Sequence, residues 1–147
     1  MTQDTRPPAV LLDTCAIIWL VNAGSLSISV LAAIRHAGQA DGVYVSTASA
    51  WEIGLLGRPR PGRKDMPQFR PDPKTWFATL VAMPGIKEAP ITPGIAIDAS
   101  YLPGDFHADP MDRLIVATAR HRGMPIVTSD RKIIAYAESG YIDVIPC

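Results

Sequence analysis

Four acidic residues stand beside the most apolar stretches of this sequence. Asp13 ends the run AVLLD and Asp130 follows PIVTS, while Glu52 lies within TASAWEIGLL and Asp112 within DPMDRLIVATA. Carboxylates held close together raise one another's pKa and are costly to keep ionised, and a divalent cation removes that cost. A set of oxygen ligands without Cys or His suits Mg²⁺, or Mn²⁺, and not zinc.

A divalent cation held by carboxylates has a characteristic chemistry with phosphate esters. It polarises the phosphodiester, brings a water towards hydroxide and stabilises the leaving oxygen. The four acids therefore predict hydrolysis of nucleic acid, provided that the fold brings them together. Taken singly, each acid is explained more simply as a helix cap or a surface charge. Asp13 or Thr14 can cap a helix, and Ser49 with Glu52 and Asp109 with Asp112 fit the spacing of a capping box.

Short apolar runs alternate along the chain with segments whose apolar residues recur at helical spacing. The expected strands cover residues 9–13, 43–46, 86–91, 125–130 and 141–146. The expected helices cover residues 14–22, 27–40, 47–56, 73–83, 92–102, 109–123 and 131–139. Strands that are apolar throughout predict a mainly parallel central sheet covered on both faces, which is a three-layer α/β/α fold.

The fold class decides where the acids would meet. In open parallel sheets, ligands bind beyond the carboxyl ends of the strands, where loops lead into helices. Right-handed crossovers bring Asp13, Glu52, Asp112 and Asp130 to that rim of the sheet, and Asp109 stands just outside it. The explanation of each acid as a helix cap becomes weaker when all four acids are considered together.

Composition sets the class of protein. The chain has 147 residues, of which 48% are hydrophobic, with 14 basic and 14 acidic side chains. The length predicts one domain covering residues 1–147, and the balanced charge excludes a general attraction to nucleic acid or an anionic membrane. Cys15 and Cys147 are too few for a disulfide framework, and no apolar run is long enough to span a bilayer, so we expect a cytoplasmic protein. Cys15 is expected to be a small buried residue.

Four segments, in this order, resemble the PIN-domain ribonucleases, specifically the VapC toxins of bacterial toxin–antitoxin pairs: LLDTCAIIWL, VSTASAWEIGLL, DPMDRLIVATA and IVTSDRKI. The resemblance implies that Asp13, Glu52, Asp112 and Asp130 bind Mg²⁺, with Mn²⁺ as an alternative. It also implies groups that orient carboxylates or water, namely Asp109, Thr14, Ser49 and Thr128. Finally, it implies an RNA substrate, a small antitoxin partner and a homodimer, formed through the apolar helix surfaces around IIWLV and WEIGLL.

A protein of balanced charge needs a local basic cluster to bind RNA. The densest cluster lies in the Pro- and Gly-rich segment 57–73, which predicts a loop inside the domain. Its candidate RNA-binding residues are Arg58, Arg60, Arg63 and Lys64, with Arg70 close by. Many relatives carry a lysine soon after WEI, which this chain lacks, and a charge run of this kind is also common in solvated loops.

Other assignments fit the sequence less well. A haloacid-dehalogenase-type phosphatase also begins with an apolar strand ending in Asp, but it needs a second acid at the position of Cys15. A response-regulator receiver needs paired acids near the first strand, and a non-catalytic binding module predicts that one of the four acids is missing. A magnesium site does not need imidazole, so His107 is not assigned to it. The aromatic residues are expected in the core or an interface: Trp19, Trp51, Trp76 and Phe77.

Overall fold

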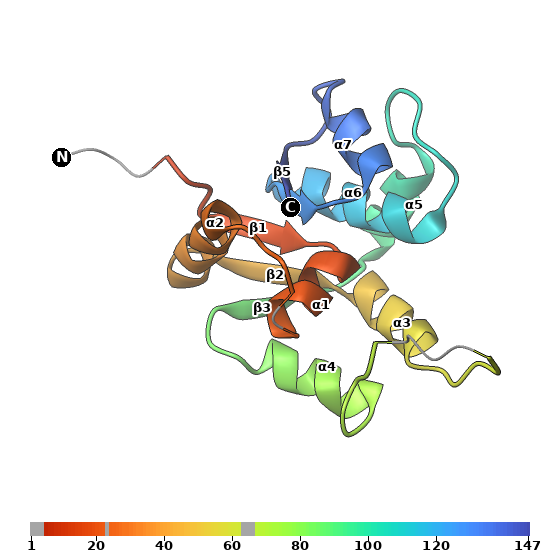
Figure 1. Ribbon diagram of the computed structural model, residues 1–147. Helices are drawn as coiled ribbons and strands as arrows, with labels where there is room; N and C mark the ends of the chain where they lie inside the picture. Colours follow the sequence, from red (N-terminus) through yellow and green to blue (C-terminus); the bar gives the residue numbers. More distant parts are fainter. Residues whose placement is uncertain (1–4, 23, 63–66) are drawn as a thin grey trace.

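A parallel β-sheet forms the centre of the protein in the computed structural model, which describes residues 5–22, 24–62 and 67–147 (Figure 1). Its strands are β1 (Ala9–Leu12), β2 (Gly42–Ser46), β3 (Ile86–Ala89), β4 (Ile126–Thr128) and β5 (Val144–Pro146). Their order is β3-β2-β1-β4-β5, and every neighbouring pair is parallel. The prediction of a three-layer α/β/α fold is confirmed.

Each of the predicted helices is present and begins within one residue of its expected start. They are α1 (Thr14–Val21), α2 (Ile28–Gln39), α3 (Thr47–Leu56), α4 (Pro73–Val81), α5 (Pro93–Ser100), α6 (Pro110–Arg122) and α7 (Arg131–Ala137). Gly123 ends α6 with a φ of 65°, a left-handed conformation that glycine adopts without steric penalty. Among the described residues, no helix has both the length and the apolar character needed to cross a membrane.

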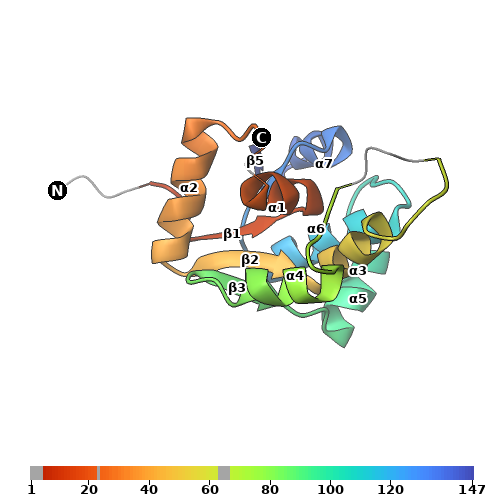
Figure 2. The same ribbon diagram turned by 60° about the horizontal axis from the view of Figure 1, so that its bottom comes forward.

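Alternate residues of the strands enter two hydrophobic cores, one on each face of the sheet. Leu11 and Ile126 pack with buried residues of α5, α6 and α7, whereas Val10, Leu12 and Val127 pack with buried residues of α1, α2 and α4. Figure 2 shows α1 lying over β1, the strand from which it continues. Strands buried on both faces explain why the runs are apolar throughout and do not alternate.

The strand order creates a crevice beside β1. From β1 the chain passes to β2 and β3 on one side of it, and later crosses to β4 and β5 on the other. Such a switch point opens a crevice at the carboxyl ends of the two adjacent strands. Asp13 follows β1 directly, and Asp130 lies two residues beyond the end of β4. The topology therefore brings together two acids that are far apart in the sequence.

Candidate active site

Asp13 is the most buried of the four predicted acids, with 5% of its surface exposed. It caps α1, and one of its carboxylate oxygens accepts a hydrogen bond from the backbone N–H of Ala16 at 2.8 Å. The other oxygen accepts a short hydrogen bond from the hydroxyl of Thr128. Burial raises the pKa of Asp13, these two bonds lower it, and the charge of Asp130 raises it. The carboxylate is thus fixed in a place that disfavours its charge.

Thr128 joins Asp13 to Asp130. While its hydroxyl donates to Asp13, the same oxygen accepts a hydrogen bond from the backbone N–H of Asp130 at 2.9 Å. Asp130 in turn caps α7, accepting from the backbone N–H groups of Lys132 at 2.8 Å and Ile133 at 3.3 Å. A single fully buried hydroxyl therefore sets the relation between the two acids of the crevice.

Glu52 reaches the same site from α3. The Thr14 hydroxyl donates to its Oε1 at 2.8 Å and also lies 3.0 Å from Oγ of Ser49. Burial raises the pKa of Glu52, the bond from Thr14 lowers it, and the charges of Asp109, Asp13 and Asp130 raise it. Of the predicted supporting hydroxyls, Thr14 therefore contacts this carboxylate directly, and Ser49 contacts Thr14.

The expected capping box of Ser49 and Glu52 is wrong. The N-cap of α3 is Ser46, whose hydroxyl accepts from the backbone N–H of Ala48 at 3.0 Å. Ser49 lies inside the helix and is fully buried against Thr14. The helix starts directly at the end of β2, one turn earlier than the box requires.

Asp112 lies in the first turn of α6, behind the cap formed by Asp109. The Asp109 carboxylate accepts from the backbone N–H groups of Met111 at 2.9 Å and Asp112 at 3.2 Å, as the sequence predicts for a cap. Burial, and then the charges of Asp109, Asp130, Glu52 and Asp13 in that order, together raise the pKa of Asp112 to about 7. Asp112 is therefore coupled to every other acid of the site.

A histidine that the sequence did not assign also contacts Asp112. Nε2 of His107 lies 3.1 Å from Oδ2 of Asp112. The only local signal was its place two residues before the helix cap Asp109. The contact depends on how a loop folds back over α6, which no periodicity encodes.

Cys15 lies close enough to all four acids for their charges to affect its thiol. Partial desolvation by the surrounding protein, and then the charges of Asp13, Glu52, Asp130 and Asp112, raise the pKa of the thiol. The expectation that Cys15 is a buried residue is wrong, since its side chain is exposed in the first turn of α1. A raised pKa keeps the group a thiol, which is a poor nucleophile.

The donor chemistry of this site fits a divalent cation. All the candidate ligands are oxygens, the acids raise one another's pKa, and the interactions that lower the pKa of Asp13 and Glu52 are hydrogen bonds and not basic side chains. In the described part of the chain, no three His, Cys, Asp or Glu side chains lie close enough together to share one ion, so the carboxylates do not converge on one point. Binding an ion thus requires the carboxylates to turn towards one another.

The basic loop begins where α3 ends. Arg58 and Arg60 are exposed, and Arg70 is exposed but held by Oε1 of Gln68 at 2.6 Å. The loop is anchored at its far end by Phe69, which is buried against Trp76 of α4 with ring centroids 4.9 Å apart. The remaining candidates, Arg63 and Lys64, lie outside the described residues.

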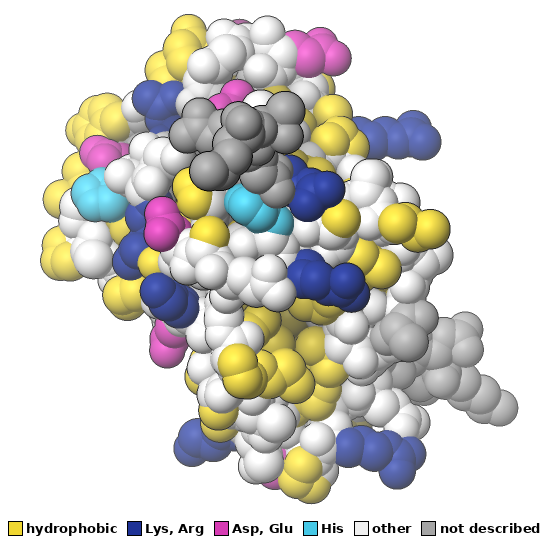
Figure 3. Space-filling view, turned by 90° about the vertical axis from the view of Figure 1, so that its left-hand side faces the viewer, with side chains coloured by type: hydrophobic (Ala, Val, Ile, Leu, Met, Phe, Trp, Pro, Cys, Tyr) yellow, Lys and Arg dark blue, Asp and Glu magenta, His cyan; other side chains and the backbone are white. Residues whose placement is uncertain are grey.

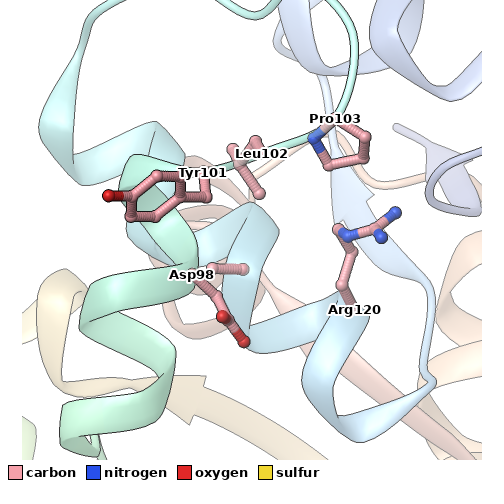
Figure 4. Close-up of a pocket in the computed structure, with 6 residues that line it drawn as sticks. Asp98, Tyr101, Leu102, Pro103 and Arg120 are labelled. Atoms are coloured by element: carbon pink, nitrogen blue, oxygen red, sulfur yellow. The ribbon is translucent and has the colours of Figure 1, made fainter.

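A pocket of about 200 Å³ lies between α5 and α6 (Figure 4). Its lining consists of Asp98, Tyr101, Leu102, Pro103, Ala117 and Arg120. Arg120 stands in the last turn of α6, whereas Asp112 stands in the first. The guanidinium of Arg120 donates a hydrogen bond to the carbonyl of Tyr141 at 2.6 Å, so this side chain has a structural role.

A wholly parallel sheet with coupled acids at its switch point defines an α/β domain with an acidic site at the carboxyl edge of its sheet. The comparison with family models agrees, since the model of the PIN domain matches residues 10–139. The chain belongs to the PIN domain family. This membership decides against the haloacid-dehalogenase phosphatase and the receiver domain.

Known proteins that resemble the chain agree with this family. Ribonuclease VapC22 of Mycobacterium tuberculosis is 34% identical over 125 residues, which are 84% of this chain and 88% of that protein. VapBC2 from Rickettsia felis, solved bound to a DNA fragment from its promoter, has the same fold with a TM-score of 0.64 at 10% identity, covering 94% of this chain and 98% of that one. VapC20 of Mycobacterium tuberculosis, described as a toxin that cleaves the sarcin-ricin loop, has a TM-score of 0.56 at 19% identity, covering 93% and 99%.

Proposed function

We propose that the chain acts as one PIN-like unit over residues 1–147 and is a metal-dependent endoribonuclease, the toxin of a VapBC-type pair. The observation that carries the proposal is the set of coupled acids at the switch point of the sheet, in a chain similar to a protein named a ribonuclease. We propose Mg²⁺ as the ion, with Mn²⁺ able to replace it, because all the ligands are oxygens.

In this proposal the ion is held by Asp13, Glu52, Asp112 and Asp130. When bound, it polarises the phosphodiester and lowers the pKa of a water. The chain's own contribution is to fix the ligands: Thr128 orients Asp13, and Thr14 orients Glu52. Asp112, whose pKa is raised to about 7, would hold the ion as a carboxylate, so binding of a cation would favour its ionised form.

Cleavage of RNA in the presence and absence of Mg²⁺ tests the activity. We expect cleavage only with the ion, and a loss of at least ~10²-fold in rate for Asp112→Asn, comparable with loss of one preorganised transition-state contact. Folding of the variant is checked by circular dichroism. Hydrolysis of p-nitrophenyl phosphate without any cleavage of RNA would reject the proposal.

We also propose that a small antitoxin covers apolar helix surfaces of this protein, which forms a homodimer and acts on RNA in the cytoplasm. Trp51 of α3 is 64% exposed and Ile28 of α2 is 88% exposed, unusually high for such large apolar side chains. Between α3 and α4 lies an apolar pocket of about 320 Å³, lined by Ala50, Gly54, Pro73, Lys74 and Phe77. Figure 3 shows hydrophobic side chains gathered in a hollow on the face at the left of Figure 1, with Lys and Arg side chains above and below it.

Expression together with the neighbouring genes tests the partner. We expect a small protein to co-purify, and analytical ultracentrifugation of the toxin alone to show a dimer. Trp51→Ser, which removes an exposed aromatic and no core contact, should weaken the complex without unfolding the chain. A clean monomer at micromolar concentration, with no co-purifying protein, would count against both partners.

A further inference from the structure

The imidazole of His107 faces the carboxylate of Asp112 from outside its helix. Nε2 lies 3.1 Å from Oδ2 of Asp112, and the two side chains are 22% and 20% exposed. Nδ1 accepts a hydrogen bond from the backbone N–H of Asp109 at 3.4 Å. A ring nitrogen that accepts carries no proton, so in the neutral imidazole the proton is on Nε2, the atom that faces Asp112.

This N–H group is buried without a well-aligned partner. Nε2 is covered by protein and makes no hydrogen bond of good geometry, although an oxygen of Asp112 is 3.1 Å away. A buried donor that lacks a partner is costly. A small rotation of the Asp112 carboxylate supplies the partner, and such a rotation is what ion binding requires of these acids.

The loop that carries His107 is held firmly in place. The guanidinium of Arg113 donates to the carbonyls of Phe106 at 2.9 Å and His107 at 3.2 Å. The hydroxyl of Tyr136 donates to the carbonyl of Pro103 at 2.6 Å. The Phe106 ring packs between His107 and Tyr136, with centroids 4.4 and 4.8 Å apart. Contacts from α6 and α7 therefore keep the imidazole at the acidic site.

We infer that His107 is a positioning residue whose Nε2–H donates to Oδ2 of Asp112 and fixes the orientation of the carboxylate that would hold the cation. The inference rests on the proposed function, since it takes Asp112 as a ligand. Carboxylates that bind metals are oriented by hydrogen bonds from neighbouring groups, and loss of such a group costs about 10–100-fold in metal affinity or activity. His107 is not itself a ligand, because the nitrogen that faces the site carries the proton.

Three substitutions of one residue separate positioning from simple packing. His107→Gln places an amide N–H where Nε2 was, His107→Asn places its amide near the position of Nδ1, and His107→Ala removes both. The probe is Mn²⁺, whose free concentration is measured by electron paramagnetic resonance with no RNA present. We expect Mn²⁺ affinity to fall about 10–100-fold in His107→Ala and His107→Asn, and to stay within ~3-fold of the wild type in His107→Gln.

RNA cleavage gives a second measurement. In His107→Ala, the Mg²⁺ concentration for half-maximal rate should rise, while the rate at saturating Mg²⁺ recovers most of its loss. Asp112→Asn is the reference. If it loses Mn²⁺ binding while His107→Ala binds like the wild type, the inference is wrong and the proposed site stands. If Asp112→Asn binds Mn²⁺ as the wild type does, the proposed site itself is wrong. Should His107→Ala not fold, equal affinities of the Gln and Asn variants would overturn the inference.

Discussion

Asp112 should make the ion-free protein less stable as the pH rises. Its pKa lies near 7 in the folded protein against an ordinary value of 3.8. Between these values the folded protein keeps a proton that the unfolded chain has already lost, so stability is greatest below pH ~4 and falls until the pH passes ~7. Burial and neighbouring charges raise the pKa of Asp13 and Glu52 too, so their contributions have the same sign.

The expected size follows from the rise in pKa. At about 1.4 kcal/mol for each pKa unit, a rise from 3.8 to about 7 corresponds to about 4 kcal/mol as an upper bound. The side chain is 20% exposed, and its carboxylate gains partners when neighbours relax. We therefore expect that about 2 kcal/mol of the unfolding free energy is lost through Asp112 between pH 4 and 8.

Urea unfolding in EDTA, at intervals from pH 4 to pH 8, measures this difference. Asp112→Asn removes the titrating group at nearly constant volume, so its unfolding free energy should fall less steeply over the same range and exceed that of the wild type at pH 8. Saturating Mg²⁺ should reverse the order, since a ligand at 100 times its Kd adds about 2.7 kcal/mol to a protein that binds it. Parallel pH profiles of wild type and Asp112→Asn would refute the reasoning.

Three further outcomes test the site. Thr128→Val removes a buried hydroxyl that joins two acids, and we expect it to lower the unfolding free energy by about 1–3 kcal/mol. The control Thr79→Val, at an exposed hydroxyl of α4, should change the unfolding free energy little. Equal effects of the two substitutions would show that Thr128 does not join the two acids. Asp13→Asn should abolish the rise in melting temperature that millimolar Mg²⁺ gives the wild type; an unchanged rise would place the ion elsewhere. The double variant Arg58→Glu with Arg60→Glu should weaken RNA binding and lower the slope of log affinity against log salt by about 1.4, with a nearly unchanged cleavage rate at saturating enzyme; an unchanged slope would identify the loop as solvated charge.

Local patterns predicted the fold because each helix and strand has a recognisable sequence pattern within a few residues. The apolar runs and the helical periodicity placed every strand and helix, and the cap of α6 at Asp109 and its end at Gly123 were confirmed. The error at Ser49 arose where two overlapping cap signals competed. The expected strand 43–46 and helix 47–56 already meet directly, and these bounds make Ser46 the cap and place Ser49 inside the helix, where it contacts Thr14.

The contact between His107 and Asp112 could not be predicted from local patterns. It depends on Arg113 and Tyr136, which hold the loop from two different helices. Neither residue differs by type or spacing from an ordinary surface arginine or core tyrosine. The contacts of Arg113 and Tyr136 with this loop can be identified only when the backbone is known. They place His107 beside Asp112, an acid that the sequence did identify.

Two of the four candidate ligands, Asp13 and Asp130, are also helix caps, so for these acids the two explanations do not compete. Asp13, Asp109 and Asp130 each accept backbone N–H groups at the start of a helix, where donors and the helix dipole favour negative charge. These bonds stabilise three carboxylates near one another in the absence of a cation. Asp112 lies inside a helix and caps nothing, and its pKa is raised to about 7. Of the acids in the crevice, Asp112 is therefore the one whose ionisation depends most on a bound cation. Its replacement by Asn should for this reason stabilise the protein without the ion and abolish the activity that depends on the ion.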